Sequence, residues 1–124
     1  GALRLPGVQF EAVTYVPRAI PGVAANPRFV GDAVQAIRIH VTDHNQVEPL
    51  ELGMHALALI TAEARRQSVQ VLPQSLDMFA KIAGTSRLYR MLSSGVDGAA
   101  IIAAWQKDVA AFKQRRGKYL LYAT

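Results

Sequence analysis

Polar side chains that can do chemistry gather in one short stretch of the sequence, AIRIHVTDHN at positions 36–45. The stretch contains Arg38, His40, Thr42, Asp43 and His44. Histidine and aspartate serve as acids, bases and ligands in many enzyme sites. The stretch is therefore either a catalytic cluster or the polar end of a strand.

The order of residues in this stretch predicts a strand. Its apolar side chains stand at odd positions from 37 to 41 and its polar side chains at even positions from 38 to 42, so each kind falls on one face of an extended chain. The following Asp43, His44 and Asn45 favour a turn. Any chemistry would lie at the C-terminal end of the strand, where ligands often bind in α/β sheets. The alternative is a solvated strand face and a turn.

The spacing of the histidines does not favour a metal site. His40 and His44 stand on extended or turn backbone and lack the spacing of helical ligands, and His55 falls on the next helix. Hydrogen-bonded or surface histidines explain these residues better than metal ligands do, even with Asp43 as a further donor. The sequence therefore predicts no metal site.

Three acidic residues near the stretch could supply the carboxylate pair of a glycoside hydrolase. They are Asp43, Glu48 and Glu51, but acids are common at the start of any helix because they complement the helix dipole. The sequence has no GxSxG motif and no phosphate-binding loop. We predict no catalytic residue and no cofactor in this chain.

The length and composition are those of a folded domain. A chain of 124 residues, 51% of them hydrophobic, fits one domain with one core. The absence of cysteine excludes disulfides and cysteine nucleophiles but leaves the compartment open. No apolar run is long enough to span a membrane, and the N-terminus lacks the pattern of a signal peptide. The opening residues, GALRLPG, are typical of a chain cut from a longer protein.

The net charge of +5 favours anionic partners in general. Part of this charge lies in KQRRGK at 113–118, which raises the question of nucleic acid. No aromatic side chains interleave with these cations, as they would on a surface that stacks single-stranded bases. A solvated helix end fits the segment better, because cations complement the helix dipole there. Nucleic acid is not the expected partner.

Periodicity and turn residues predict the elements that position the stretch at 36–45. Strands are expected near 8–16 and 34–42, and SVQVLP at 68–73 can supply a short third strand. KYLLY at 118–122 is a terminal strand or an extended arm. Helices are expected near 49–66, 76–83, 86–94 and 98–116. The fold class is α/β, or α+β, in a single small domain whose few-stranded sheet packs with about four helices.

Cap residues and an apolar stripe support this assignment. Ser75, Thr85 and Asp97 can begin helices, and Gly84 and Gly95 can end them. The helix at 49–66 is apolar on most sides and is expected to be well buried. The expected core residues are Leu57, Ile101, Trp105 and Phe112 from the helices, with Ile39 and Val41 from the second strand.

Four segments are ordinary alone but distinctive in their order along the chain: IPG…NP at 20–27, IHVTD at 39–43, AGTSRLYRMLSSG at 83–95, and a final W…F…R…YLLY. In this order they closely resemble the C-terminal region of the bacterial exo-β-N-acetylmuramidase family, long catalogued as a domain of unknown function. The likeness covers nearly the whole chain. One departure is TAEARRQSVQVLPQS, which is shorter than is usual in the family.

The resemblance implies part of a glycoside hydrolase that removes terminal β-1,4-linked N-acetylmuramic acid from peptidoglycan fragments. Family members have a Rossmann-like N-terminal domain with the catalytic glutamate and a smaller C-terminal domain, with the cleft between them. Residues 1–124 would be that auxiliary C-terminal domain. Its partners would be the N-terminal catalytic domain and peptidoglycan fragments, in a periplasmic or secreted parent. The chain alone should be inactive, because half a cleft cannot hold both sides of the sugar.

The resemblance also suggests a role for the stretch at 36–45. Arg38 or His40 would pair with the lactyl carboxylate of muramic acid, which distinguishes it from N-acetylglucosamine. Thr42 and Asp43 would bind sugar hydroxyls. The alternative function is a non-catalytic interaction module for domain docking, dimerisation or glycan binding, which an exposed apolar patch would favour.

Overall fold

The computed structural model describes residues 3–73 and 75–121. Its contacts divide the chain into two compact units, Gly1–Glu48 and Pro49–Thr124. The first is a β-hairpin unit and the second is a helical unit. With one antiparallel sheet and four helices among the described residues, the fold belongs to the α+β class, as expected.

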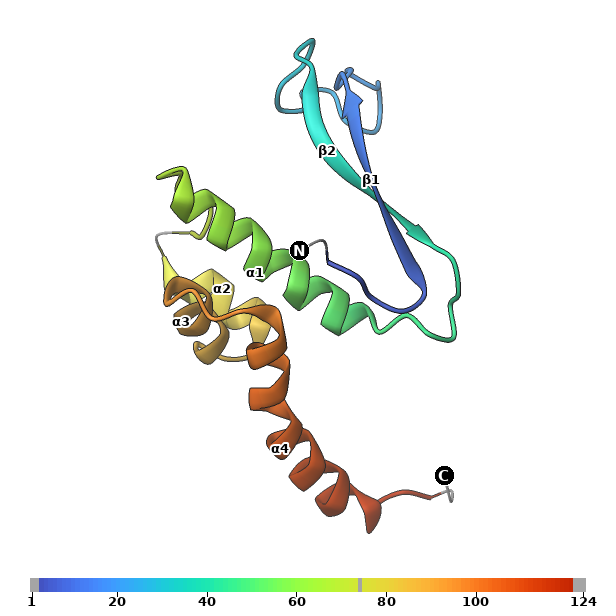
Figure 1. Ribbon diagram of the computed structural model, residues 1–124, viewed down its shortest axis with the longest axis vertical. Coiled ribbons are helices and arrows are strands. Elements are labelled where there is room, and N and C mark those ends of the chain that lie inside the picture. The colour runs from blue at the N-terminus through green and yellow to red at the C-terminus, as the bar shows by residue number, and fades with distance from the viewer. Residues whose placement is uncertain (1–2, 74, 122–124) are drawn as a thin grey trace. The chain divides into compact units, whose positions relative to one another are not determined.

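The hairpin unit consists of two antiparallel strands, β1 at Val8–Tyr15 and β2 at Val34–Val41 (Figure 1). The register pairs Val8 with Val41 at one end and Tyr15 with Val34 at the other. Both strands begin and end within one residue of the predicted positions. Alternation of apolar and polar residues explains why the sequence predicted the bounds of both strands.

The hairpin has one largely apolar face, most of which is exposed. Its members are Val8, Phe10 and Ala12 of β1 with Ile37, Ile39 and Val41 of β2. Only Val8 is buried, whereas Ile39 is 45% exposed and Val41 48% exposed. The predicted burial of Ile39 and Val41 is therefore wrong. Alternation identifies the apolar face, but a two-stranded sheet has no second layer with which to bury it.

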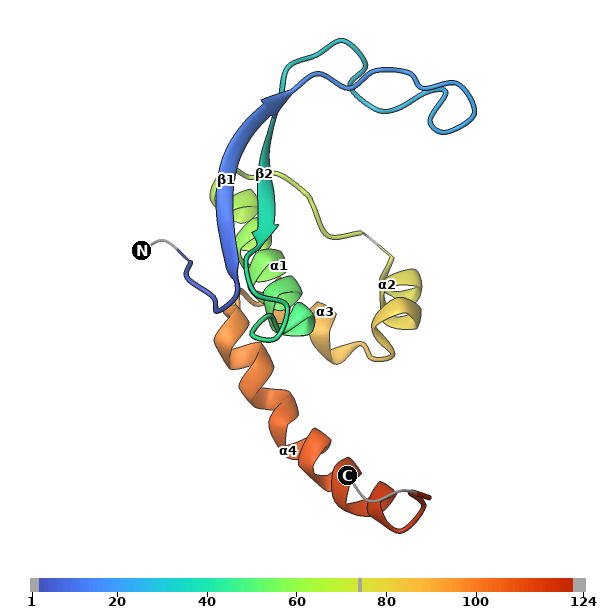
Figure 2. The same cartoon turned by 90° about the vertical axis from the view of Figure 1, so that its right-hand side faces the viewer.

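The helical unit contains α1 at Pro49–Arg66, α2 at Leu76–Ala83, α3 at Arg87–Ser93 and α4 at Gly98–Gly117 (Figure 2). All four match the predicted helices within one residue at each end. The caps are also as predicted at two helices, since Ser75 accepts a hydrogen bond from the Asp77 amide and Asp97 accepts one from the Ala100 amide. At α3 the Thr85 hydroxyl accepts from the Arg87 amide.

The core of the helical unit forms where α1, α3 and α4 meet. Ala58, Leu88, Leu92 and Ile101 are buried there, and Leu57 and Trp105 pack against them while remaining half-buried. The prediction that Ile101, Leu57 and Trp105 belong to the core is therefore confirmed, with only Ile101 fully buried. The core is small because α1 buries only one face, at Ala58, Thr61 and Ala64. The expectation that α1 is well buried on most sides is wrong.

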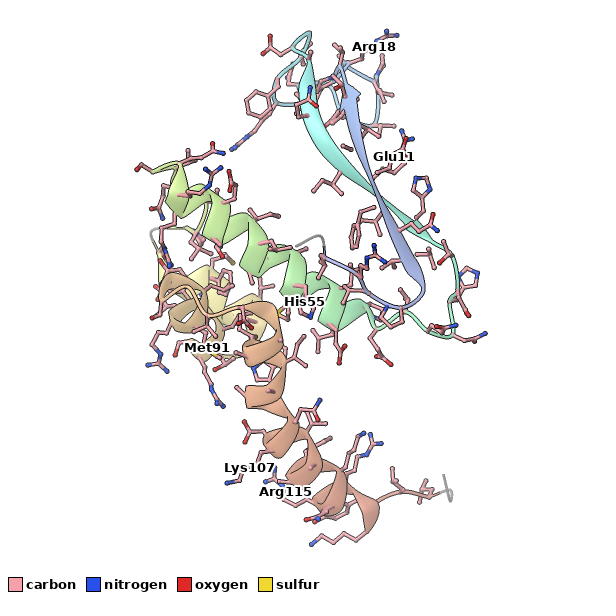
Figure 3. The ribbon with its side chains drawn as sticks, in the orientation of Figure 1. Glu11, Arg18, His55, Met91, Lys107 and Arg115 are labelled. Atoms are coloured by element: carbon pink, nitrogen blue, oxygen red, sulfur yellow. The ribbon has the colours of Figure 1, made fainter. Side chains whose placement is uncertain are left out.

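The second half of α4 extends beyond this core. Every residue from 106 to 121 is exposed, and Phe112 is 54% exposed, so its predicted burial is wrong. Lys107 and Arg115 project from this part of the helix in Figure 3. The cations of KQRRGK lie at the C-terminal end of α4, as predicted, with Arg115 and Arg116 in its last turn.

Two segments for which a strand was considered, 68–73 and 118–122, do not form one in the described residues. The segment at 68–73 does not join a strand ladder, although Val69 and Val71 alternate with polar residues. The part of KYLLY that the structure describes, 118–121, is not a strand either, and Tyr122 lies outside the described residues. An alternating sequence forms a sheet only where a neighbouring strand pairs with it, and the alternation does not show whether such a strand is present.

Candidate functional site

The polar face of the hairpin brings Arg38 and His40 of β2 together with Glu11 of β1. Glu11 stands directly opposite Arg38 in the register, and His40 lies two residues further along the same face. The Arg38 guanidinium is 3.2 Å from Glu11 Oε2, and His40 Nε2 is 2.8 Å from the same oxygen. Figure 3 labels Glu11 beside the strands of the hairpin. Two potential cations therefore share one carboxylate oxygen.

This arrangement lowers the pKa of Glu11 from its ordinary value. The largest cause is the hydrogen bond with His40, and the positive charge of Arg38 acts in the same direction. Glu11 is thus a carboxylate at neutral pH. All three side chains remain about half exposed, at 59% for Arg38, 48% for His40 and 49% for Glu11. The group is open to a solvent-borne ligand.

Glu11 is the member of this group that sequence reasoning missed. It lies far from the stretch at 36–45 in sequence and becomes a neighbour only through strand pairing. A signal was present, because Glu11 occupies a polar position of an alternating strand. Locating it would have required the register, which depends on the long connection between the strands.

Asp43 forms hydrogen bonds within the turn that follows β2. Its Oδ1 accepts from the Asn45 amide at 2.9 Å, and its Oδ2 accepts from the Gln46 side chain at 2.7 Å. Both carboxylate oxygens therefore have a partner inside the turn, which is the alternative role considered for this residue. Thr42 next to it is exposed, and its amide donates to Gly7 O at 2.8 Å.

Gly7 fixes this turn against the start of β1. Its φ is +70°, and a Cβ at this position would lie 2.5 Å from Asp43 O and 2.9 Å from Val47 N. No other residue can combine this backbone conformation with so close an approach. The turn at 42–47 is therefore held by main-chain contacts, which also position the end of the polar face.

The other candidate residues do not join this group. His44 is exposed in the turn, and His55 lies on α1, where a Cβ at Gly98 would come within 2.6 Å of its Nδ1. Within residues 3–73 and 75–121, no three His, Asp or Glu side chains stand close enough to hold a metal ion. The site is a polar strand face with one ion-paired carboxylate and no nucleophile poised beside a base.

Comparison with known proteins assigns the chain to a family. Residues 1–122 match the family described as "Exo-beta-N-acetylmuramidase NamZ, C-terminal". The chain belongs to this family. It is also 26% identical over 121 residues to the "Peptidoglycan beta-N-acetylmuramidase NamZ" of Bacillus subtilis (strain 168). No solved structure gave a significant match.

The match covers nearly all of this chain but only part of the NamZ relative. It covers 98% of this chain but 27% of the relative's length. The chain is thus a peptidoglycan exo-muramidase-related domain, and the matched region includes both strands and the polar face at Glu11, Arg38 and His40. None of the helices in the described part of the chain is long and apolar enough to cross a membrane.

Proposed function

We propose that this chain is the C-terminal domain of a two-domain peptidoglycan exo-β-N-acetylmuramidase and completes its substrate cleft. The family match over residues 1–122 is the observation that supports this most strongly. The N-terminal domain of the same protein would supply the catalytic groups. Hydrolysis of a glycoside requires a positioned acid and a second group that activates or stabilises the incoming nucleophile, and the hairpin offers no such pair.

The polar face of the hairpin is the proposed contact with terminal N-acetylmuramic acid. The Arg38 guanidinium has five N–H donors and uses one of them for Glu11. Its remaining donors can bind a second carboxylate, such as that of the lactyl group. His40 lies on the same face and shares Glu11 Oε2 with Arg38. Thr42 and Asp43 at the end of the strand would face sugar hydroxyls, with Asp43 contributing lone pairs that its turn bonds do not use.

Kinetics of the full-length parent test this role. Arg38→Ala or His40→Ala should lower kcat/KM for a chromogenic β-N-acetylmuraminide by about ten- to a hundredfold, the value of a lost charge-assisted hydrogen bond. Arg18→Ala is the matched control, because Arg18 is an exposed cation of the same unit outside the strands. The 124-residue chain alone should release no muramic acid. Unchanged kinetics in both strand variants would exclude this face from the cleft.

A second candidate function is a non-catalytic module that docks to another domain. The exposed apolar face of the hairpin favours it, since Ile37 is 70% exposed beside Ile39 and Val41. In that case Ile37→Ser with Ile39→Ser should abolish binding to the separately produced catalytic domain, while Arg38→Ala leaves both binding and kinetics unchanged. Sedimentation of the mixed domains and assays of the parent separate the two functions.

A further inference from the structure

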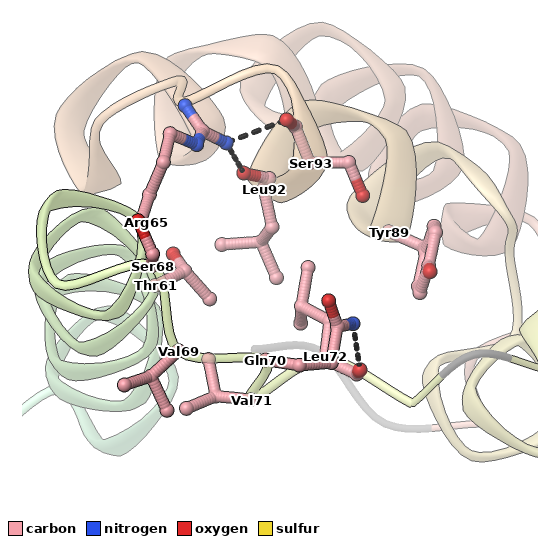
Figure 4. Close-up of a pocket in the computed structure, with 10 residues that line it drawn as sticks. All are labelled: Thr61, Arg65, Ser68, Val69, Gln70, Val71, Leu72, Tyr89, Leu92 and Ser93. Carbon is pink, nitrogen blue, oxygen red and sulfur yellow. Dashed lines mark hydrogen bonds between the residues drawn. The ribbon is translucent and has the colours of Figure 1, made fainter.

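A pocket of about 440 Å³ opens on the helical unit, and none of its lining residues belongs to the strands or the turn proposed to meet the sugar. Its walls come from the end of α1, from the segment at 68–72 and from Tyr89, Leu92 and Ser93 of α3 (Figure 4). Leu92 is fully buried and supplies an apolar base. The volume lies within the range of small-molecule and peptide sites.

The segment at 68–72 has the sequence of a strand but no strand partner in the described part of the chain. Val69 and Val71 are 54% and 46% exposed. The segment is held at both ends, because the Val69 amide donates to Ala64 O and Pro73 O accepts from the Tyr89 hydroxyl. Between these anchors, no hydrogen bond to another described residue uses the main-chain groups of Gln70 and Val71. An extended peptide can pair with such a main chain.

Among the described residues, Arg65 is the charged side chain that lines this pocket, and no carboxylate lines it. Its Nη2 donates to Leu92 O at 3.0 Å and to Ser93 O at 2.5 Å, at the end of α3. The guanidinium also packs against Gly95, where a Cβ would collide with Nη1. Arg65 is thus held in place by main-chain contacts, and its charge is not cancelled by an acidic neighbour in the pocket. A fixed cation over an apolar base favours an amphipathic anion.

We propose that this pocket binds the C-terminal end of a short, extended peptide with apolar side chains. The peptide main chain pairs with Gln70 and Val71, its last side chain packs on Leu92, and its terminal carboxylate meets Arg65. The inference does not rest on the proposed function, since every residue involved belongs to the helical unit and none to the hairpin.

Titration of the 124-residue chain with N-acetyl-alanyl-alanine, followed by amide NMR, tests the proposal. The free acid should shift signals from residues 68–72 and 89–93 and should bind at least about tenfold more tightly than its C-terminal amide. An amidated peptide with an internal aspartate should bind as weakly as the amide. The proposal would be overturned if the amide, or the amidated peptide with an internal aspartate, bound as tightly as the free acid. Signal shifts confined to residues outside 68–72 and 89–93 would also overturn it.

Two variants and a matched control sharpen this test. Arg65→Gln should weaken binding of the free acid about ten- to a hundredfold, whereas Arg66→Gln should not, because Arg66 pairs with Glu63 instead of lining the pocket. Val71→Asp keeps the helices intact, since Val71 is exposed, and places a repelling carboxylate at the pocket wall. Undiminished binding by Val71→Asp would contradict the proposal even if Arg65→Gln failed to fold.

Discussion

The two units of this chain bury their apolar side chains to different degrees. In the helical unit, residues from three helices close around Leu92 and Ile101, which are 0% exposed. In the hairpin unit the ladder is regular over its whole length, yet most of its apolar face remains open. Regular secondary structure therefore does not by itself create a core. Apolar residues of the helices pack against one another within the helical unit, whereas most apolar residues of the sheet face remain exposed.

The largest contrast should appear when one apolar residue is shortened in each unit. Leu92→Ala should lower the free energy of unfolding by about 2–5 kcal/mol, because it removes packed atoms and leaves a cavity. Ile37→Ala, at a side chain that is 70% exposed, should change it by about 0.5 kcal/mol or less. Urea denaturation measures both. A cost at Ile37 equal to that at Leu92 would show that the apolar face is covered in solution.

Backbone strain offers a second contrast, within the hairpin unit. Gly7→Ala should destabilise the hairpin by about 1–3 kcal/mol from its positive φ, with a further cost from the collision with Asp43 O. Gly31→Ala has a similar φ of +84° but no atom within 4 Å of the added Cβ, so it should show only the strain. Amide exchange of the β1–β2 ladder reports the difference. Equal effects would mean that the turn relaxes around position 7.

The helix caps should make a smaller contribution. Asp97→Ala should cost about 1 kcal/mol, because Asp97 accepts from the Ala100 amide at 2.8 Å at the start of α4. Ser75→Ala should cost less, since its bond to the Asp77 amide is long at 3.4 Å. Thermal unfolding followed by circular dichroism checks the order of the two variants. A reversed order would show that the longer bond is the stronger cap.

The smallest effects concern two exposed carboxylates, one in each unit. Bonds from Arg66 and Gln67 lower the pKa of Glu63 from 4.5 to about 2, and those from His40 and Arg38 lower the pKa of Glu11. A carboxyl with a depressed folded pKa contributes stability above its unfolded pKa and loses it as pH falls through the folded pKa. The contribution of Glu63 should therefore fade between about pH 4.5 and 2.

Carboxyl carbon NMR titration tests both shifts. The midpoint of Glu63 should lie near 2, and that of Glu11 should rise toward its ordinary value in His40→Ala. An unshifted Glu11 in the unmodified chain would mean that the contact with His40 is not maintained in solution.

The sequence predicted local structure well because the deciding signals are local. Alternation defined β1 and β2, and Ser75, Gly84 and Asp97 marked helix ends that the structure confirms. It failed where a distant partner decides the outcome. Ile39 carries the pattern of a buried residue but is 45% exposed, and 68–73 carries the pattern of a strand but joins no ladder with another described residue. Glu11, the partner of Arg38 and His40, became visible only with the register.

The exposed second half of α4 has a consequence for local unfolding. Beyond Trp105 the helix has no buried side chain to hold it, so its persistence depends on helix propensity and on the favourable position of Arg115 and Arg116 in the last turn. Such a segment opens at a small fraction of the global unfolding free energy. Amide protection should decline along α4 from Ile101 towards Gly117, and a protease should cut the distal turns while the packed first turns stay intact.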